Sequence, residues 1–194
     1  MKHSNKLVLG SQSPRRRDLL KNAGFQFEVR SIDHNEVFPD DMPAQDVAEF
    51  LAIEKNRAFR QQLDDEIVIT ADTVVISKEQ ILGKPKDKVE AINMLSTLSG
   101  ISHLVVSGVC VSDNQNRHSF SSTTEVKIKT LSIKEIDHYV SKYKPFDKAG
   151  AYGIQEWFGL IAVEWIKGSF YNVVGLPIHK VCTILTEEFS ISPY

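Results

Sequence analysis

Several features that would define a class of protein are scarce in this sequence or missing from it. Only two cysteines occur in 194 residues, Cys110 and Cys182, and each lies in an apolar stretch. A disulfide framework needs more cysteines in a regular pattern, so we expect two buried free thiols. No apolar run approaches the roughly 18 residues of a membrane-spanning helix, and none near the start is long enough for a signal peptide. We therefore expect a cytoplasmic protein that binds no membrane.

Motifs of several enzyme classes are missing as well. The six histidines are scattered without HExxH or another paired spacing, which argues against zinc. Neither a GxSxG nucleophile turn nor a GxGxxG dinucleotide fingerprint occurs. The formal net charge of −2 argues against binding of nucleic acid through overall charge. Any anionic ligand must therefore be held by a local cluster of cations.

Helix-like and strand-like segments alternate along the chain, with no repeat and no low-complexity linker. This alternation predicts an α/β fold with a mixed twisted sheet around a central cleft. The length suits one domain spanning residues 1–194, or two tightly joined lobes. Strands are expected at 6–10, 25–32, 66–77, 102–112, 120–130 and 160–168, and helices at 14–23, 44–63, 89–98, 133–143 and 176–189.

Three adjacent arginines, Arg15, Arg16 and Arg17, occupy the first turn of the helix expected after Ser13. A helix N-terminus favours an anion, so cations placed there oppose the helix dipole unless an anion lies between them. The stretch is either a solvated basic turn, partly offset by Asp18, or a binding site for a ligand with several phosphates.

A carboxylate and two lysines are further candidates. Asp72 interrupts the apolar run that begins at Ile67, and a carboxylate at or just beyond the end of a buried strand is a common metal ligand or general base. Lys84 lies in a stiff turn between Gly83 and Pro85, which is not a P-loop because the first glycine and the Ser/Thr are missing. Lys55 lies on the helix expected at 44–63. Each of the three side chains has an alternative, purely structural interpretation.

An acidic loop follows the strand expected at 25–32. Its Asp33 and Glu36, together with Asp72, could supply oxygen ligands to Mg²⁺ or Mn²⁺, hard cations that prefer carboxylate and phosphate oxygens. The alternative is an ordinary solvated loop. Taken together, cations for phosphates, a carboxylate for a metal or water, and a glycine- and aromatic-rich loop at 144–159 match the needs of a nucleoside triphosphate.

Eight motifs resemble, in order, those of the Maf-like nucleoside triphosphate pyrophosphatases, from about residue 7 to residue 188. They are "SQSPRRRDLL", "LAIEKNRA", "TADTVV", "LGKPKD", "LSG", "SGV", "KPFDKAGAYGIQ" and "GSFYNVVGLP". The form of "DKAGAYGIQ" resembles the branch that acts on dTTP and UTP. Two stretches depart from the family pattern, namely "IDHNEVFP" and the Glu156-Trp157 pair, which stands where glycine is common.

The resemblance implies a fold like that of the inosine-triphosphate pyrophosphatases, with the site in the cleft between lobes. It implies that Asp72 is the proton acceptor and that Asp72 and Glu36 hold a divalent metal cation, Mg²⁺ or Mn²⁺. Residues implied to contact the triphosphate are Ser11, Arg16, Lys55 and Lys84. Residues implied to select the base are Arg15, Thr73 and Gln155. A homodimer is also consistent with the resemblance.

The resulting hypothesis is an enzyme that converts dTTP, UTP and related or modified pyrimidine triphosphates to the monophosphate and pyrophosphate, in a house-cleaning role. Gln155 carries a donor and an acceptor and could read O4 and N3–H of thymine or uracil. One alternative is a non-catalytic nucleotide-binding regulator of septum formation and cell division. Another is an enzyme that removes inosine or xanthosine triphosphate.

Overall fold

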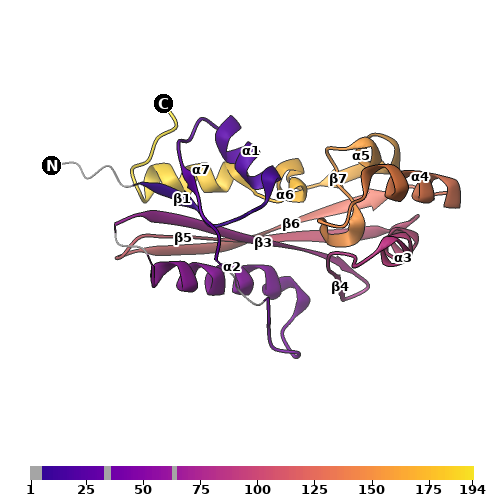
Figure 1. The fold of residues 1–194 in the computed structure, drawn as a ribbon, viewed down its shortest axis with the longest axis horizontal. Helices are drawn as coiled ribbons and strands as arrows, with labels where there is room; N and C mark the ends of the chain where they lie inside the picture. Colours follow the sequence, from indigo (N-terminus) through magenta and orange to yellow (C-terminus); the bar gives the residue numbers. More distant parts are fainter. Residues whose placement is uncertain (1–5, 33–35, 63–64) are drawn as a thin grey trace. The chain divides into compact units, whose positions relative to one another are not determined.

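The computed structural model describes residues 6–32, 36–62 and 65–194 and shows alternating helices and strands around one mixed sheet (Figure 1). The strands are β1 (Leu7–Leu9), β2 (Glu28–Val29), β3 (Ile67–Ser77), β4 (Gln80–Leu82), β5 (Ser102–Ser112), β6 (Arg117–Ile128) and β7 (Val163–Lys167). The helices are α1 (Pro14–Asn22), α2 (Ala44–Arg60), α3 (Lys88–Leu98), α4 (Ile133–Tyr143), the 3₁₀ turn η1 (Ala149–Ala151), α5 (Trp157–Ala162), α6 (Phe170–Val174) and α7 (Ile178–Glu187).

The sheet is mixed in direction, as predicted. Its strand order is β2-β1-β3-β5-β6-β7, with β4 paired to β3. Strand β1 is parallel to both of its neighbours, whereas β4 is antiparallel to β3 and β7 is antiparallel to β6. The predicted α/β class with a mixed sheet is therefore confirmed.

The chain divides into two compact units. Unit 1 contains residues 1–72, 107–122 and 175–194, and unit 2 contains residues 73–106 and 123–174. Strands β3, β5 and β6 each contribute residues to both units. The single domain over residues 1–194 and the central cleft between lobes stay predictions, and each unit is described by itself below.

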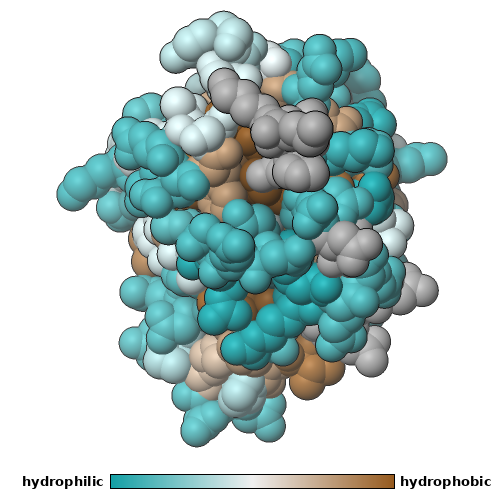
Figure 2. Space-filling model, turned by 90° about the vertical axis from the view of Figure 1, so that its left-hand side faces the viewer, coloured by the Kyte–Doolittle hydropathy of each residue, from teal (hydrophilic) through white to brown (hydrophobic). Residues whose placement is uncertain are grey.

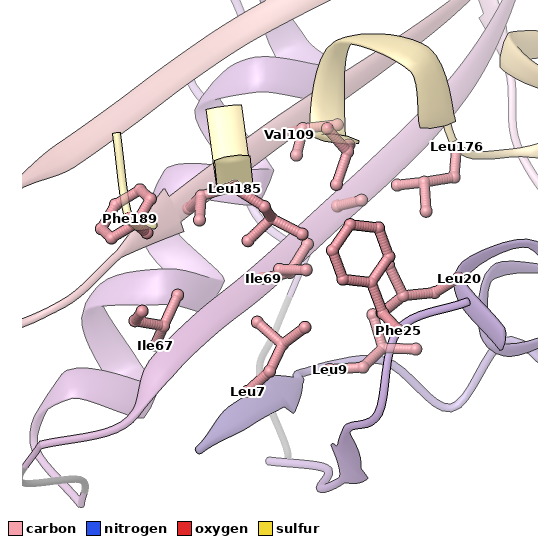
Figure 3. Packing of buried hydrophobic residues seen from close by; sticks show 13 residues of the cluster. Leu7, Leu9, Leu20, Phe25, Ile67, Ile69, Val109, Leu176, Leu185 and Phe189 are labelled. Atoms are coloured by element: carbon pink, nitrogen blue, oxygen red, sulfur yellow. The ribbon is translucent and has the colours of Figure 1, made fainter. Parts of the chain in front are cut away.

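Unit 1 buries its apolar side chains on both faces of its strands. Side chains in a strand alternate between the two faces, so β1 and β3 send one set toward α1 and α7 and the other toward α2 (Figure 1). The first set forms the larger cluster (Figure 3), which includes Leu7, Leu9, Leu20, Phe25, Ile67, Ile69, Val109, Val181 and Leu185. On the other face Val8 and Val68 pack against Phe59 of α2. Such two-sided burial explains why the β3 sequence reads as a nearly continuous apolar run.

Unit 2 contains α3, α4, α5 and α6 with the remaining parts of the long strands. Helix α4 begins with a capping box in which Ser132 and Glu135 bond each other's backbone N–H groups. The hydrogen bond from the Lys129 ammonium, followed by those from the Ser132 backbone N–H and hydroxyl, lowers the pKa of the Glu135 carboxyl group to about 2. Lys88 of α3 forms an ion pair with Asp137 of α4, with 2.7 Å between Nζ and Oδ1.

The surface and the cysteines agree with the composition. On the face drawn in Figure 2 hydrophilic side chains dominate and hydrophobic ones show in small patches. Of the helices in the described ranges, none combines the length and apolar character that crossing a membrane requires. Cys110 and Cys182 are free thiols, as predicted, with Cys110 buried and Cys182 partly buried. Burial raises the pKa of the Cys110 thiol to about 12.

Two expected strands differ from the observed structure. The strand expected at 25–32 is reduced to β2, whose two residues pair with β1. Within the strand expected at 160–168, residues 160–162 belong to α5 and only Val163–Lys167 form β7. Short apolar runs suit a strand and a buried helical turn equally well, so periodicity alone does not distinguish them.

Candidate active site

Asp72 lies inside β3 rather than at its end. The strand continues through Asp72 to Ser77, where it pairs with β4, so the strand predicted over residues 66–77 is confirmed. The β-branched residues Thr73, Val74, Val75 and Ile76 after it favour extended backbone, which explains the continuation. Asp72 is only 8% exposed, and a carboxylate that is buried to this degree requires partners.

Lys55 of α2 supplies that partner and bridges two carboxylates. Its ammonium group forms an ion pair with Asp72 Oδ2 and, at 2.8 Å, with Glu36 Oε1. The Lys55 and Asp72 side chains are 17% and 12% exposed, whereas that of Glu36 is 48% exposed. The structure thus places Lys55 between Asp72 and Glu36, the two carboxylates that were expected to share a metal ion, and it leaves the Glu36 side open to solvent.

Two polar side chains beside this cluster fix α2 against the strands. Thr70 Oγ1 donates to the Ala52 carbonyl of α2 at 2.7 Å. Asn56, next to Lys55, is fully buried; its amide donates weakly to Val68 O and its Oδ1 accepts from Ser112 Oγ at 2.7 Å. These bonds set the axial position of α2 and therefore the place of Lys55 opposite Asp72. The sequence analysis missed them, although an asparagine on the apolar face of a predicted helix is a usable signal.

Gly108 of β5 makes the close approach of α2 possible. A Cβ atom at this position would lie 2.2 Å from the backbone carbonyl of Ala48 and the backbone nitrogen of Glu49, both in α2. No side chain is tolerated at such a distance from backbone atoms, so glycine is required here for steric reasons.

Arg16 binds backbone more than the sequence analysis expected. Its Nε donates to Gly175 O at 2.8 Å, and its Nη1 donates to Ala71 O at 2.8 Å and to Ser11 Oγ at 3.2 Å. Ser11 Oγ also accepts the backbone N–H of Ser13 at 3.3 Å. The guanidinium therefore connects three separate parts of unit 1. These are Ser11 in the turn after β1, Ala71 directly before Asp72, and Gly175 in the segment before α7.

Arg16 interacts electrostatically with three other charged residues of unit 1, namely Asp72, Arg15 and Glu36. Burial lowers the pKa of the Arg16 guanidinium, and the negative charge of Asp72 opposes this effect. The neighbouring Arg15 cation lowers the same pKa further, while Glu36 raises it. Arg16 consequently stays a cation within the field of both carboxylates, next to the α1 N-terminus, where the amides favour an anion.

Lys84 lies in unit 2 on an exposed turn whose ends are held. Before it, the Gly83 carbonyl accepts the Gly150 N–H at 3.0 Å; after it, Pro85 is buried. Asp87 then caps α3 by accepting the Glu90 N–H at 2.9 Å. Thr73 is also in unit 2, and strand alternation puts its side chain on the face of β3 opposite Asp72.

Gln155 lies at the tip of a four-residue turn in unit 2. The Glu156 N–H donates to the Gly153 carbonyl at 3.1 Å, which leaves Ile154 and Gln155 as the two central residues. Ile154 is buried and Gln155 is exposed. The turn therefore presents the Gln155 amide to solvent while its other central side chain anchors it.

Two carboxylates of unit 1, Asp72 and Glu36, are the residues that could hold a divalent cation. Within residues 6–32, 36–62 and 65–194 no group of three or more His, Cys, Asp and Glu side chains is placed to hold a metal ion. Asp72 and Glu36 nevertheless both form ion pairs with the Lys55 ammonium, so the two carboxylates lie close together. Mg²⁺ is commonly held by one or two carboxylates together with substrate phosphates. Asp33, the third carboxylate considered, lies outside the described residues.

A buried carboxylate paired with lysine, beside a basic helix N-terminus, is the kind of site found in enzymes that act on phosphate esters. A family model described as Maf-like protein matches residues 6–188, and the chain belongs to this family. The chain is 49% identical over 178 residues to a Porphyromonas gingivalis protein named dTTP/UTP pyrophosphatase, covering 90% of this chain and 89% of the relative. A Phocaeicola vulgatus protein of the same name is 44% identical over 182 residues, with coverages of 93% and 94%.

Among solved structures, the Ham1 protein of Staphylococcus aureus aligns with a TM-score of 0.48 at 17% identity. The alignment covers 64% of this chain and 72% of that protein.

Proposed function

We propose that this chain hydrolyses dTTP and UTP, and related modified pyrimidine triphosphates, to the monophosphate and pyrophosphate. The observation that carries the proposal is the Lys55 ammonium bridging Asp72 and Glu36 next to the α1 N-terminus. The pyrimidine preference is supported by the relatives named dTTP/UTP pyrophosphatase, at up to 49% identity over most of the chain. We also propose that the chain has a house-cleaning role, in which it removes unwanted nucleotides, and that it acts in the cytoplasm.

Asp72 is the general base in this proposal. Its low exposure and its strand position hold the carboxylate in one place, and an attacking water that donates to it would be oriented toward the α-phosphorus. Lys55, already on Asp72 in the structure, stabilises negative charge on the phosphates as pyrophosphate leaves. A bound Mg²⁺ or Mn²⁺, held by Asp72 and Glu36, would supply additional charge neutralisation at the phosphates.

The remaining predicted residues have supporting roles. Ser11, Arg16 and the exposed Lys84 bind phosphate oxygens, and Arg16 also orders Ser11 and keeps the α1 N-terminus beside β3. We assign base selection to Gln155, Arg15 and Thr73. A Gln155 amide presented at the tip of a turn offers a donor and an acceptor to the pyrimidine edge. A homodimer remains part of the proposal, and light scattering on the purified chain tests it.

The deciding experiment measures pyrophosphate release with Mg²⁺ or Mn²⁺ from dTTP, UTP, CTP, ITP and the other common triphosphates. We expect turnover concentrated on dTTP and UTP, its loss when a chelator removes the metal, and a fall of about 10²–10⁴-fold in Asp72→Asn. Near-normal turnover in that variant would exclude Asp72 as the base. Nucleotide binding without turnover on any triphosphate would instead favour the regulatory alternative in septum formation.

A further inference from the structure

The turn that carries Gln155 is held at both ends by one hydroxyl group. Tyr139 of α4 accepts the Gly153 N–H at 3.0 Å and donates to Glu156 Oε2 at 2.6 Å. Gly153 and Glu156 are the first and last residues of the turn whose second central residue is Gln155. A single side chain on a neighbouring helix therefore contacts both ends of the turn, in addition to the backbone hydrogen bond between Glu156 and Gly153 that closes it.

Glu156 uses its carboxylate for this contact rather than for its own helix. It is the N-cap residue of α5, yet its side chain makes no capping bond. Instead Oε2 binds Tyr139 and Oε1 lies 3.1 Å from the Lys148 ammonium, whose side chain is 10% exposed. The Glu156 carboxylate therefore does not accept the backbone N–H groups of the first turn of α5, as an N-cap side chain usually does. Its bonds to Tyr139 and to the buried Lys148 hold it in a specific position.

Gly153 leaves the space that this carboxylate fills. A Cβ atom at Gly153 would lie 2.8 Å from the Glu156 side-chain carboxyl carbon. Burial, and then the hydrogen bond to Glu156, raise the pKa of the Tyr139 hydroxyl, so Tyr139 remains a donor at neutral pH. Gly153, the first residue of the turn, thus contacts the side chain of Glu156, the last residue, and Tyr139 hydrogen-bonds to both.

The segment before the turn is anchored independently. The Tyr152 hydroxyl lies 2.7 Å from His103 Nε2, and both residues are buried. Gly150 donates its N–H to Gly83, and Ala151, with a φ of 61°, adopts a conformation that non-glycine residues rarely enter. With the chain fixed up to Tyr152 and the turn closed by its own backbone bond, the bonds of Tyr139 and Glu156 are the side-chain restraint on the ends of the turn that carries Gln155.

We propose that Tyr139 and Glu156 are positioning residues that hold Gln155 in the orientation required to read the pyrimidine edge, and so determine selectivity among triphosphates. This inference rests on the proposed function. An unrestrained Gln155 amide can present its donor and acceptor in reversed order, which is the order that cytosine pairs with. Loss of the restraint therefore lowers use of dTTP and UTP while CTP use is preserved.

The test compares kcat/KM for dTTP, UTP and CTP in Tyr139→Phe, Glu156→Ala and Glu156→Gln. Tyr139→Phe keeps the ring, which packs on Tyr143, Trp157 and Phe158, and removes only the hydroxyl. We expect kcat/KM for dTTP and UTP to fall by about tenfold to a hundredfold in Tyr139→Phe and Glu156→Ala, as for other misplaced contact groups. Glu156→Gln, which keeps an acceptor for Tyr139, should retain most of the selectivity.

A double-mutant cycle with Gln155→Ala separates positioning from general destabilisation. If Tyr139 acts through Gln155, adding Tyr139→Phe to Gln155→Ala has no further effect on the dTTP-to-CTP ratio. Tyr143→Phe, which removes a hydroxyl from the same aromatic group, should leave the ratio unchanged. Equal losses for all three triphosphates, or a full Tyr139→Phe effect without Gln155, would overturn the inference while pyrimidine turnover by the unmodified enzyme still supported the proposed function. Absence of turnover in the unmodified enzyme would overturn both.

Discussion

At the scale of single residues, the ion pair between Lys55 and Asp72 contributes both to the stability of the fold and to the proposed reaction. Its ammonium neutralises a carboxylate that is 8% exposed and would otherwise be costly to bury. The same ammonium reaches Glu36 on the solvent side, so the cluster is closed on one side by α2 and open on the other. The pairing with Lys55 fixes the Asp72 carboxylate beside the group that we propose stabilises the phosphates.

Replacing Lys55 by methionine separates these two roles. Lys55→Met leaves the Asp72 charge buried without this partner, and we expect the free energy of unfolding to fall by about 3 kcal/mol, together with a large loss of pyrophosphate release. Adding Asp72→Asn to Lys55→Met removes the stranded charge, so stability should largely recover while activity does not. Denaturant titration and pyrophosphate assays of the three variants measure this; recovery of activity in the double variant would contradict the assignment of Asp72 as base.

Residue patterns predicted the members of the unit 1 site but not all of their tasks. The motifs pointed to Ser11, Arg16 and Lys55, with Lys84 of unit 2, as phosphate-binding residues and to Asp72 as the proton acceptor. They did not reveal that Arg16 bonds to the carbonyl of Gly175, which is 159 residues further along the chain. A backbone carbonyl has no sequence signature, so such a bond is invisible before the chain is folded.

At the scale of elements, the position of α2 decides the geometry of the site. The helix is fixed by hydrogen bonds from Thr70 and Asn56 and by the missing side chain at Gly108. Its start near Ala44 was predicted from the sequence, and its apolar face was visible in the spacing of the hydrophobic residues. Its height above the strands was not, because that height depends on a glycine in β5, in another part of the chain.

A methyl group at Gly108 should move α2 away from the strands. In Gly108→Ala the new Cβ meets the Ala48 backbone, so we expect a loss of about 1–3 kcal/mol of stability, as in other overpacked interiors. The Lys55–Asp72 pair should be displaced as well, with a fall in kcat larger than the change in KM. Gly83→Ala is the matched control for stability, since a Cβ there has no heavy atom within 4 Å. Equal stabilities of the two variants in thermal unfolding would refute the close-approach argument.

At the scale of the whole molecule, one buried histidine makes stability depend on pH. Burial lowers the pKa of His103 to about 4. Its Nε2 lies next to the Tyr152 hydroxyl, and its Nδ1 is buried with no hydrogen-bond partner among the described residues. The folded state therefore favours the neutral ring, whereas the unfolded chain titrates near the ordinary value of about 6.5.

The sign of the pH effect follows from proton uptake. Between pH 6.5 and 4 the unfolded chain binds a proton that the folded chain does not, so stability falls as the pH is lowered through this window. The full contribution of His103 amounts to roughly 3 kcal/mol, present above pH 6.5 and lost by pH 4. Denaturant unfolding across this range tests it, with His103→Gln as the variant in which the slope should decrease. An unchanged slope in that variant would assign the acid sensitivity to other groups.

The sequence by itself determined the alternation of helices and strands and the buried character of β3, and it predicted which residues bind the phosphates. These features depend on short-range patterns, such as a proline after Ser13, apolar periodicity and a carboxylate within a β-branched run. Only the tertiary structure decided that Glu36, Lys55 and Asp72 meet, that Arg16 binds backbone carbonyls and that Tyr139 holds the Gln155 turn. Such contacts join residues that are far apart in the chain, and their existence depends on packing distances and hydrogen-bond geometry that no local pattern encodes.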